Sequence, residues 1–531
     1  MVKRMLLMVV VAAVVGMLAP GAVTADTPKV KLGNEVLMEK YRHLIDGKNV
    51  GLVTNQTGVN SNGDSVIDVL AGDPSVRLTA LYGPEHGIDG KAKAGAYVAS
   101  YTHPTLGIPV YSLYGSTRKP TAEMLKNIDV LLFDIQDIGS RTYTYMSTLN
   151  YCMKAAKEND KQVIVLDRPN PVGGVIVEGP VLEEGYETFV GVDNLPMAHG
   201  MTAGELAQFF NRQIGADLKV MPIEGWTREM TFQDTGLPWV PTSPNVPDLD
   251  SLFGYMATGL GEGTGIFQSD KFKWIGGKGI DANKFAGLMN GAGLLGVTFA
   301  PEYRGEAGGV RLHITDYHKF NPAKTGFYAL AHARALNNFQ VPKSGRTMVM
   351  FDKVMGSDKV GRWLEQGLTP QQIVEKYTPE LNRFKKEREK YLIYGCKTPP
   401  TSDGQPESKP AAPDDQPEIL VYVGGNQVMF DAPPFVDGSN RLMVPLRAIV
   451  EAMGAQCVWD PHAKEIYISG RGKSVLFTLN SREAKVDGER KNMDTTPVIK
   501  NSRTMVPARY VGEFMGARVD WDPGLRVVKI Y

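Results

Sequence analysis

The segment DVLLFDIQD, residues 129–137, is a short apolar run with polar side chains at its end. Runs of this length are typical of strands that are buried on both faces of a parallel sheet. Three other segments repeat the design, which therefore predicts a sheet with polar groups at one edge. These are VGLVTN (50–55), VRLTALYG (76–83) and QVIVLDRPN (162–170).

Helical patterns separate the apolar runs, at residues 121–128 and 143–160. Alternation of strands and helices predicts an α/β fold with a Rossmann-like, doubly wound sheet, here placed at residues 26–200. Beyond it, Thr202 and Glu205 fit a capping box that opens a helix, and residues 309–316 alternate like a half-exposed strand. We therefore expect an auxiliary α/β subdomain at residues 201–395.

The last part of the chain is set apart by a segment rich in Pro, Ser, Asp and Gln at residues 396–418, which predicts an extended linker. An internal repeat follows, because residues 440–461 match residues 502–523 in M-V-P-x-R and W-D-P signatures. Each copy predicts a helix, a glycine turn and a strand, so residues 419–531 should form a small α+β module with two repeats. The module resembles the stalk-like domain at the N-terminus of some copper amine oxidases. That resemblance implies attachment to the cell wall or surface and, with His462 as the module's single histidine, no copper chemistry.

The chain has 531 residues and a formal net charge of zero. Because nucleic-acid binders normally carry a basic excess, we expect no nucleic-acid partner. The first residues differ from the rest, since a basic start precedes an apolar run and a small-residue end. This pattern predicts a signal peptide at residues 1–25, and hence a secreted or cell-surface protein; an uncleaved membrane anchor is the alternative.

Polar residues at the ends of the predicted strands should meet at one edge of the sheet, where ligands bind in folds of this class. Carboxylates, amides, imidazoles and a guanidinium gather there beside tyrosines. Such a mixture suits a sugar, whose hydroxyl groups need many hydrogen-bond partners. The candidate residues are Asn55, Gln56, Glu85, His86, Asp134, Gln136, Asp137, Tyr143, Asp167, Arg168, Asn170, Glu178 and His199.

Glu85 stands out, because a carboxylate between Pro84 and His86 at a strand end has no evident packing role. Hydrolysis of a glycosidic bond needs a proton donor at the leaving oxygen and commonly uses a second carboxylate. Glu85 fits the donor, with His86 orienting or polarising it.

Structural explanations compete with the catalytic one at several other positions. Helix capping could explain Asp134 and Asp137, and His199 could simply precede a helix cap. Asp167 and Arg168 could form a structural ion pair. Turn chemistry could explain Asn170.

A metal site is a further alternative, with His86, His199 and His313 as ligands. The H-x-x-E-H and H-E-x-x-H spacings of zinc hydrolases do not occur in the sequence. We therefore expect neither a metal nor another cofactor.

Several motifs together resemble the exo-β-N-acetylmuramidases of bacterial cell-wall recycling, over about residues 30–395. They are TNQTG (54–58), GPEHG (83–87), FDIQDIGSRTYTY (133–145), DRPNPVGG (167–174), EGPVL (178–182), HGMTAGELA (199–207), SPNVPDLDS (243–251), FDKVMGSDKVGRWLEQGLTPQQI (351–373) and FKKEREKYLIY (384–394).

The resemblance implies cleavage of N-acetylmuramic acid from the non-reducing ends of peptidoglycan fragments, with Glu85 as the catalytic residue. A second carboxylate is implied at Glu178, with Asp134 and Asp167 as alternatives. Because muramic acid carries a lactyl carboxylate, the resemblance also implies an arginine in the site. Arg141 and Arg168 are the candidates for it.

The sequence departs from this family in residues 254–277, which lack an Asn and an Arg that the family usually carries and look shortened at 259–266. Ala198 also stands where the family often has Arg before H-G-M-T. Two alternatives therefore stay open. One is a wall-glycan binding protein without turnover, and the other is a metal-dependent deacetylase or amidase.

Overall fold

The computed structural model describes residues 30–395 and, with short gaps, 419–531; the gaps are 425, 429, 431–433, 438–440, 461–462, 501–502 and 523–526. The predicted signal peptide and linker, and His462, lie outside the described residues. Contacts divide the chain into two compact units. The first ends at residue 397 and the second begins at residue 398. Among the described residues, no helix is both long and apolar enough to cross a membrane.

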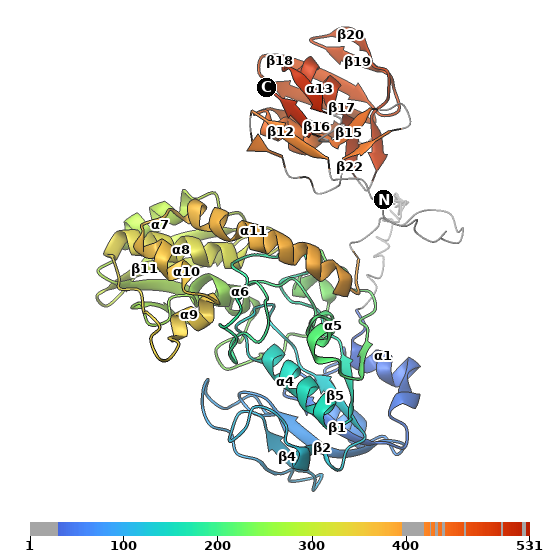
Figure 1. Ribbon diagram of the computed structural model, residues 1–531, viewed down its shortest axis with the longest axis vertical. Helices are drawn as coiled ribbons and strands as arrows, with labels where there is room; N and C mark the ends of the chain where they lie inside the picture. The colour runs from blue at the N-terminus through green and yellow to red at the C-terminus, as the bar shows by residue number, and fades with distance from the viewer. Residues whose placement is uncertain are drawn as a thin grey trace, which may run out of the picture. The chain divides into compact units, whose positions relative to one another are not determined.

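The first unit is built on a seven-stranded sheet in the order β3-β4-β2-β1-β5-β6-β7 (Figure 1). All neighbouring strands are parallel except β3 and β4. The four strands predicted from apolar runs are β1, β2, β5 and β6, and the predicted α/β class is confirmed. The bounds are β1 (Asn49–Thr54), β2 (Arg77–Gly83), β3 (Tyr101–Thr102), β4 (Pro109–Ser112), β5 (Val130–Asp134), β6 (Gln162–Leu166) and β7 (Leu218–Met221).

Both faces of this sheet are buried, which explains why its strands are apolar throughout. On β5, Leu131 and Phe133 join the core on the face covered by α4 and α5, whereas Val130 and Leu132 join the core on the face covered by α1 and α2. The sheet is therefore doubly wound, as predicted. The helices are α1 (Gly33–Lys40), α2 (Val66–Ala71), α3 (Ala122–Leu125), α4 (Tyr145–Glu158) and α5 (Ala203–Ile214).

The sheet continues past residue 200, where the sequence analysis placed the end of the first domain. Helix α5 opens with the predicted capping box, since Thr202 Oγ1 accepts from Glu205 N and Thr202 N donates to Glu205 Oε2. This helix leads into β7, which pairs with β6. Strand β7 has four residues and only one fully buried side chain, so its sequence lacks the apolar run that marks the inner strands.

The rest of the first unit is an antiparallel sheet in the order β10-β11-β9-β8 with helices packed on it (Figure 1). One continuous core joins this part to the α4 face of the larger sheet. The predicted strand at 309–316 corresponds to β11. The elements are α6 (Leu249–Thr258), β8 (Ile266–Ser269), β9 (Trp274–Lys278), α7 (Ala282–Asn290), β10 (Val297–Arg304), β11 (Ala307–Ile314), α8 (Pro322–Asn337), α9 (Met350–Met355), α10 (Lys359–Glu365) and α11 (Pro370–Arg388).

The second unit has its own core and shows the predicted repeat as a pseudo-twofold arrangement. Strands β15 and β22 pair antiparallel with Val444 opposite Val506, and these are equivalent positions of the two repeats. Each strand runs directly into a short helix. The repeat elements are β15 (Leu442–Pro445), α12 (Leu446–Ala452), β16 (Gln456–Asp460) and β17 (Glu465–Gly470), then β21 (Val498–Lys500), β22 (Arg503–Pro507), α13 (Ala508–Phe514), β23 (Val519–Asp522) and β24 (Val527–Ile530).

The remaining strands of this unit extend three separate sheets. A meander of five strands runs from β16 through β17 to β20, and the other two sheets have four strands each. Their bounds are β12 (Leu420–Val423), β13 (Asn426–Gln427), β14 (Phe435–Val436), β18 (Lys473–Thr478), β19 (Glu483–Val486) and β20 (Glu489–Asn492).

Candidate active site

The strand order reverses between β1 and β5, and a sheet of this kind binds ligands beyond the carboxyl ends of the strands at such a point. The loops after these two strands are tied together there. Thr54 Oγ1 donates to the carbonyl of Asp134 (2.8 Å), and Gln136 N donates to Thr57 Oγ1 (2.9 Å). Asn55 accepts from Thr57 N and Oγ1, while its own Nδ2 has no partner among the described residues.

Glu85 follows β2, the neighbour of β1, and the residue is buried, with 9% of its surface exposed. Oε1 accepts from the backbone N–H of Gly95 (2.8 Å), and Oε2 accepts from the hydroxyl of Thr144 (2.6 Å). Thr144 is the N-cap residue of α4, so the carboxyl lies at a helix N-terminus, where a negative charge is favoured. The predicted donor is therefore a buried carboxyl held in one orientation by two hydrogen bonds.

Tyrosine side chains surround Glu85. Burial raises the pKa of Tyr114, and the nearby Glu85 carboxylate raises it further. Glu85 also contributes to the raised pKa of Tyr145, which burial dominates. Tyr143 and Tyr145 meet edge to face with ring centroids 4.9 Å apart. Tyr114 and Tyr145 thus lie near the carboxyl, and Tyr143 packs on Tyr145.

His86 has a positive φ of 72°, a backbone conformation that costs energy for any residue with a Cβ. Its Nδ1 lies 2.6 Å from the carbonyl oxygen of Ala92, so Nδ1 carries a proton and donates it. Ala92 N donates back to the carbonyl of His86 (3.2 Å). His86 therefore closes the loop that brings Gly95 to Glu85, which favours a positioning role.

Asp137 and His199 form a second buried pair, with His199 Nε2 3.3 Å from Asp137 Oδ2. His199 Nδ1 accepts from Met201 N, so a neutral ring carries its proton on Nε2, toward the carboxylate. The pair does not form a hydrogen bond, and neither Nε2 nor Asp137 Oδ1 has a hydrogen-bond partner among the described residues. Asp137 thus has one buried carboxylate oxygen without a hydrogen-bond partner among the described residues, while Oδ2 accepts from Gly139 N (2.8 Å).

Tyr255 links these groups, although the sequence analysis did not select it. Burial, more than anything else, raises its pKa to about 12, and three carboxylates add to the effect: Glu85, Glu262 and Asp137. Thr142 Oγ1 donates to its hydroxyl (3.3 Å). The charges of Glu85 and Asp137 therefore both act on the Tyr255 hydroxyl.

Glu262 is the other residue that the sequence analysis missed. It lies in the turn between α6 and β8, in the segment noted only for the residues that it lacks. The turn is closed by Thr264, which bonds the carbonyl of Gly261 through both its N–H and its hydroxyl. The feature of the sequence that could have indicated Glu262 is its place as an acidic residue in GEGTG (261–265), directly before a strand.

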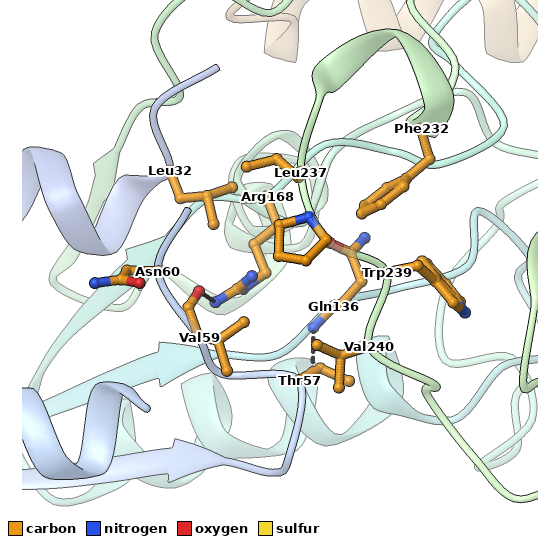
Figure 2. Close-up of a pocket in the computed structure, with 11 residues that line it drawn as sticks. Leu32, Thr57, Val59, Asn60, Gln136, Arg168, Phe232, Leu237, Trp239 and Val240 are labelled. Atoms are coloured by element: carbon orange, nitrogen blue, oxygen red, sulfur yellow. Dashed lines mark hydrogen bonds between the residues drawn. The ribbon is translucent and has the colours of Figure 1, made fainter. Parts of the chain in front are cut away.

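Arg168 does not face these carboxylates but packs in a separate hollow (Figure 2). Its Nε lies 2.5 Å from Asp134 Oδ1, and its Nη2 donates to the carbonyl of Val59 (2.6 Å). Asn34 Nδ2 donates to the other Asp134 oxygen (3.0 Å). The hollow beside Arg168, walled by Trp239 and other apolar side chains, has a volume of about 10 Å³ and is too small for a sugar.

Asp167 lies inside the protein, where four groups donate to it: Arg168 N, Gly204 N, Thr202 Oγ1 and Tyr394 Oη. Burial raises the pKa of Asp167 to about 7, against the effect of these hydrogen bonds. The carboxyl thereby joins the end of β6 to the start of α5 and to the end of the first unit. This is a structural role, but not the predicted ion pair with Arg168, because the Arg168 guanidinium pairs with Asp134 instead.

Arg141 and Glu178 also contact protein groups away from Glu85. Arg141 donates to the carbonyls of Pro180, Leu195 and Val354, and burial lowers its pKa to about 9. Glu178 accepts from Tyr377 Oη (3.0 Å) and Asn321 Nδ2 (3.1 Å), on α11 and at the start of α8. The structure therefore does not bring Glu178 together with Glu85.

Three amides complete the set of predicted residues, and each connects loops. Gln56 donates to the carbonyls of Pro241 and Thr242, and Gln136 donates to those of Asp137 and Pro169. Asn170 Nδ2 donates to the carbonyl of Met201 (3.0 Å). Among the described residues, no three His, Cys, Asp or Glu side chains are placed to hold a metal ion together.

The comparison with known families agrees with the division into units. Residues 50–250 match the N-terminal model, and residues 253–394 the C-terminal model, of the exo-β-N-acetylmuramidase NamZ. Residues 422–530 match the copper amine oxidase N-terminal domain.

Individual relatives cover the first unit almost completely. The peptidoglycan β-N-acetylmuramidase NamZ of Bacillus subtilis (strain 168) is 45% identical over 388 residues, 70% of this chain and 93% of the relative. Crystal structures of two DUF1343 family proteins from Bacteroides fragilis, 38% and 27% identical, superpose with TM-scores of 0.62 and 0.53. Each covers 69% of this chain and 99% of its own.

Proposed function

The chain belongs to the exo-β-N-acetylmuramidase NamZ family and is a glycoside hydrolase, and from this premise we propose that it releases N-acetylmuramic acid from the non-reducing ends of peptidoglycan fragments. The relative from Bacillus subtilis is named for β-N-acetylmuramidase activity on peptidoglycan. The observation that carries the proposal is the placement of Glu85, a buried carboxyl beyond the end of β2 with tyrosines beside it.

In this proposal Glu85 is the general acid that protonates the leaving glycosidic oxygen. Thr144 and Gly95 hold the carboxyl, and His86 holds the loop that supplies Gly95. Preorganisation of this kind removes the entropic cost of orienting the donor in the transition state.

Asp137 is the second carboxylate that the geometry favours. Its Oδ1 has no hydrogen-bond partner among the described residues, and its charge, like that of Glu85, adds to the raised pKa of Tyr255. Asp134, Asp167 and Glu178 all accept hydrogen bonds from groups that belong to the scaffold. His199, whose Nε2 faces Asp137, would orient this carboxylate.

Export and wall attachment complete the proposal. The basic, apolar and small-residue pattern of residues 1–25 supports export by a cleaved signal peptide. The second unit, which matches a domain distinct from the catalytic one, supports a separate attachment function. N-terminal sequencing of the protein recovered from culture medium or cell wall tests the first point, with Asp26 as the expected first residue.

Release of a chromogenic phenol from its β-glycoside with N-acetylmuramic acid tests the activity itself. We expect turnover of this substrate, no turnover of the N-acetylglucosamine analogue, and a loss of about 10³-fold in kcat for Glu85→Gln. A folded wild-type protein that turned over neither sugar would contradict the proposal, and sensitivity to a chelator would then indicate a metal-dependent hydrolase.

A further inference from the structure

A hollow of about 560 Å³ lies on the second unit, where the start of α12 faces strands β16, β21 and β22. This volume falls within the usual range of small-ligand sites. Its lining is mixed in character: apolar side chains, an indole, two guanidinium groups, a thiol, a hydroxyl and the carboxylate of Glu451. The residues that matter for the argument are Leu446, Arg447, Ala448, Trp459, Ile499 and Arg503.

The two repeats differ at several positions that line this hollow, and at one of them the second repeat carries a large aromatic side chain in place of a small one. Ala448 in the first repeat corresponds to Tyr510 in the second. The Tyr510 ring packs on Phe514 with centroids 5.4 Å apart, and its hydroxyl accepts from Asp494 N (3.1 Å). Asp494 in turn pairs with Arg441, the equivalent of Arg503 (2.6 Å). In the second repeat, Tyr510 therefore extends from α13 toward the segment that carries Arg441. In the first repeat, the small side chain of Ala448 leaves the equivalent space open.

The equivalent arginines of α12 and α13, Arg447 and Arg509, also differ in their ion pairing. Arg509 pairs with Glu513 one turn along α13, at 2.7 Å. The equivalent Arg447 is exposed; Glu451, the equivalent of Glu513, also lines the hollow, but no carboxylate of the described residues lies within ion-pair distance of Arg447. Burial raises the pKa of the Cys457 thiol, which also lines the hollow, and the Arg447 guanidinium acts against this shift. The first repeat therefore presents a guanidinium that is not engaged by an acidic side chain.

The apolar part of the lining is unusually accessible. Trp459 is 36% exposed and Ile499 is 59% exposed, while Leu446 and Ile466 form a buried floor. An indole and aliphatic groups can cover the face of a pyranose ring, and a guanidinium binds a carboxylate with paired, charge-assisted hydrogen bonds. The combination fits a sugar ring that carries a carboxylate.

We propose that this hollow binds muramic acid units of cell-wall glycan strands whose lactyl carboxylates are free of stem peptides, and so supplies the attachment function of the second unit. The inference rests on the proposed peptidoglycan substrate, because it identifies the glycan that the first unit would cleave with the glycan that the second unit holds. Arg447 binds the lactyl carboxylate, and Trp459 covers the ring. Ala448 keeps the space that Tyr510 fills in the other repeat.

The test measures binding of the full chain to soluble glycan strands that are freed of stem peptides and phosphate polymers. Glu85→Gln is the background, so that strands are bound but not cut. Within it, Ala448→Tyr fills the hollow with the residue that the other repeat uses, and Arg447→Gln removes the carboxylate partner. The matched control is Arg509→Gln, the equivalent arginine of the second repeat.

We expect Ala448→Tyr and Arg447→Gln each to raise the dissociation constant by about tenfold or more, with Arg509→Gln within about twofold of the background. Conversion of the muramyl carboxylates to amides should weaken binding by the background protein equally. Unchanged binding by Ala448→Tyr and Arg447→Gln would overturn the proposal. Binding that required the phosphate polymers or the stem peptides would overturn it as well.

Two controls separate this inference from the proposed activity. Turnover of the chromogenic substrate by Ala448→Tyr with Glu85 intact should equal that of the wild type, because the substitution lies in the other unit. A wild-type protein without turnover would contradict the proposed function and leave the binding result readable. If Ala448→Tyr does not fold, the exposed Arg447→Gln carries the test alone.

Discussion

The hydroxyl of Thr144 donates a 2.6 Å hydrogen bond to Glu85 Oε2 and thereby joins the loop after β2 to the first turn of α4. The two residues lie far apart in the sequence, and the bond fixes the direction in which the carboxyl points. If Glu85 delivers a proton to a glycosidic oxygen, its orientation matters as much as its presence.

Replacement of Thr144 by Val should therefore lower kcat for the muramic acid substrate by about tenfold with little change in KM. Thr144→Ser keeps the hydroxyl and should restore most of the rate. Steady-state kinetics of both variants provide the measurement. Equal activity of Thr144→Val and the wild type would show that this bond does not position the acid.

Asp137→Asn should lower kcat by about 10²-fold, because the amide keeps the shape of the side chain but removes the negative charge. His199→Gln should have a smaller effect, since the imidazole is fully buried and faces Asp137. The ratio of the two losses in kcat is the measurement. A greater loss in His199→Gln than in Asp137→Asn would reverse these roles.

Glu178→Gln should leave kcat within about threefold of the wild type and lower the free energy of unfolding by about 1 kcal/mol. The substitution weakens the acceptor for Tyr377 Oη and Asn321 Nδ2, which join Glu178 to α11 and α8. Kinetics and urea unfolding of the same preparation test both parts. A loss in kcat comparable to that of Glu85→Gln, in a protein of normal stability, would restore Glu178 as the second carboxylate.

Asp167 should make stability depend on pH below neutrality. Its pKa in the folded protein is raised to about 7 from 3.8, mainly by burial. Between these values the folded state binds more protons than the unfolded state, so this contribution is present at low pH and is lost as the pH rises through 7.

Asp167→Asn removes this titration. Relative to the wild type, the variant should therefore gain about 2 kcal/mol in the free energy of unfolding between pH 5 and pH 8. Urea unfolding at the two pH values gives the comparison. Parallel pH profiles for the two proteins would show that Asp167 does not titrate in this range.

The local pattern of the sequence was sufficient for much of the fold. The apolar runs of β1, β2, β5 and β6 reflect burial on both faces, and the Thr202–Glu205 capping box reflects the unpaired N–H groups at a helix start. Strand β7 escaped detection because an edge strand buries little, so its side chains carry no periodic signal.

The candidate site was less predictable, because polar residues at strand ends look alike in sequence whether they serve the scaffold or the ligand. Asp134 and Asp137 are three positions apart after the same strand. Asp134 is paired with Arg168, whereas Asp137 keeps an oxygen without a hydrogen-bond partner in the described part of the chain. Tyr255 and Glu262 reach the site from α6 and the turn after it, which no local pattern connects to β2.

The sequence by itself determined the α/β class, the repeat in the second unit and the singling out of Glu85, because each depends on the spacing of residues along the chain. Only the tertiary structure decided which carboxylates are engaged by the scaffold. Ion pairs and hydrogen bonds form between groups brought together from distant segments, and the chain's long-range packing alone sets those distances.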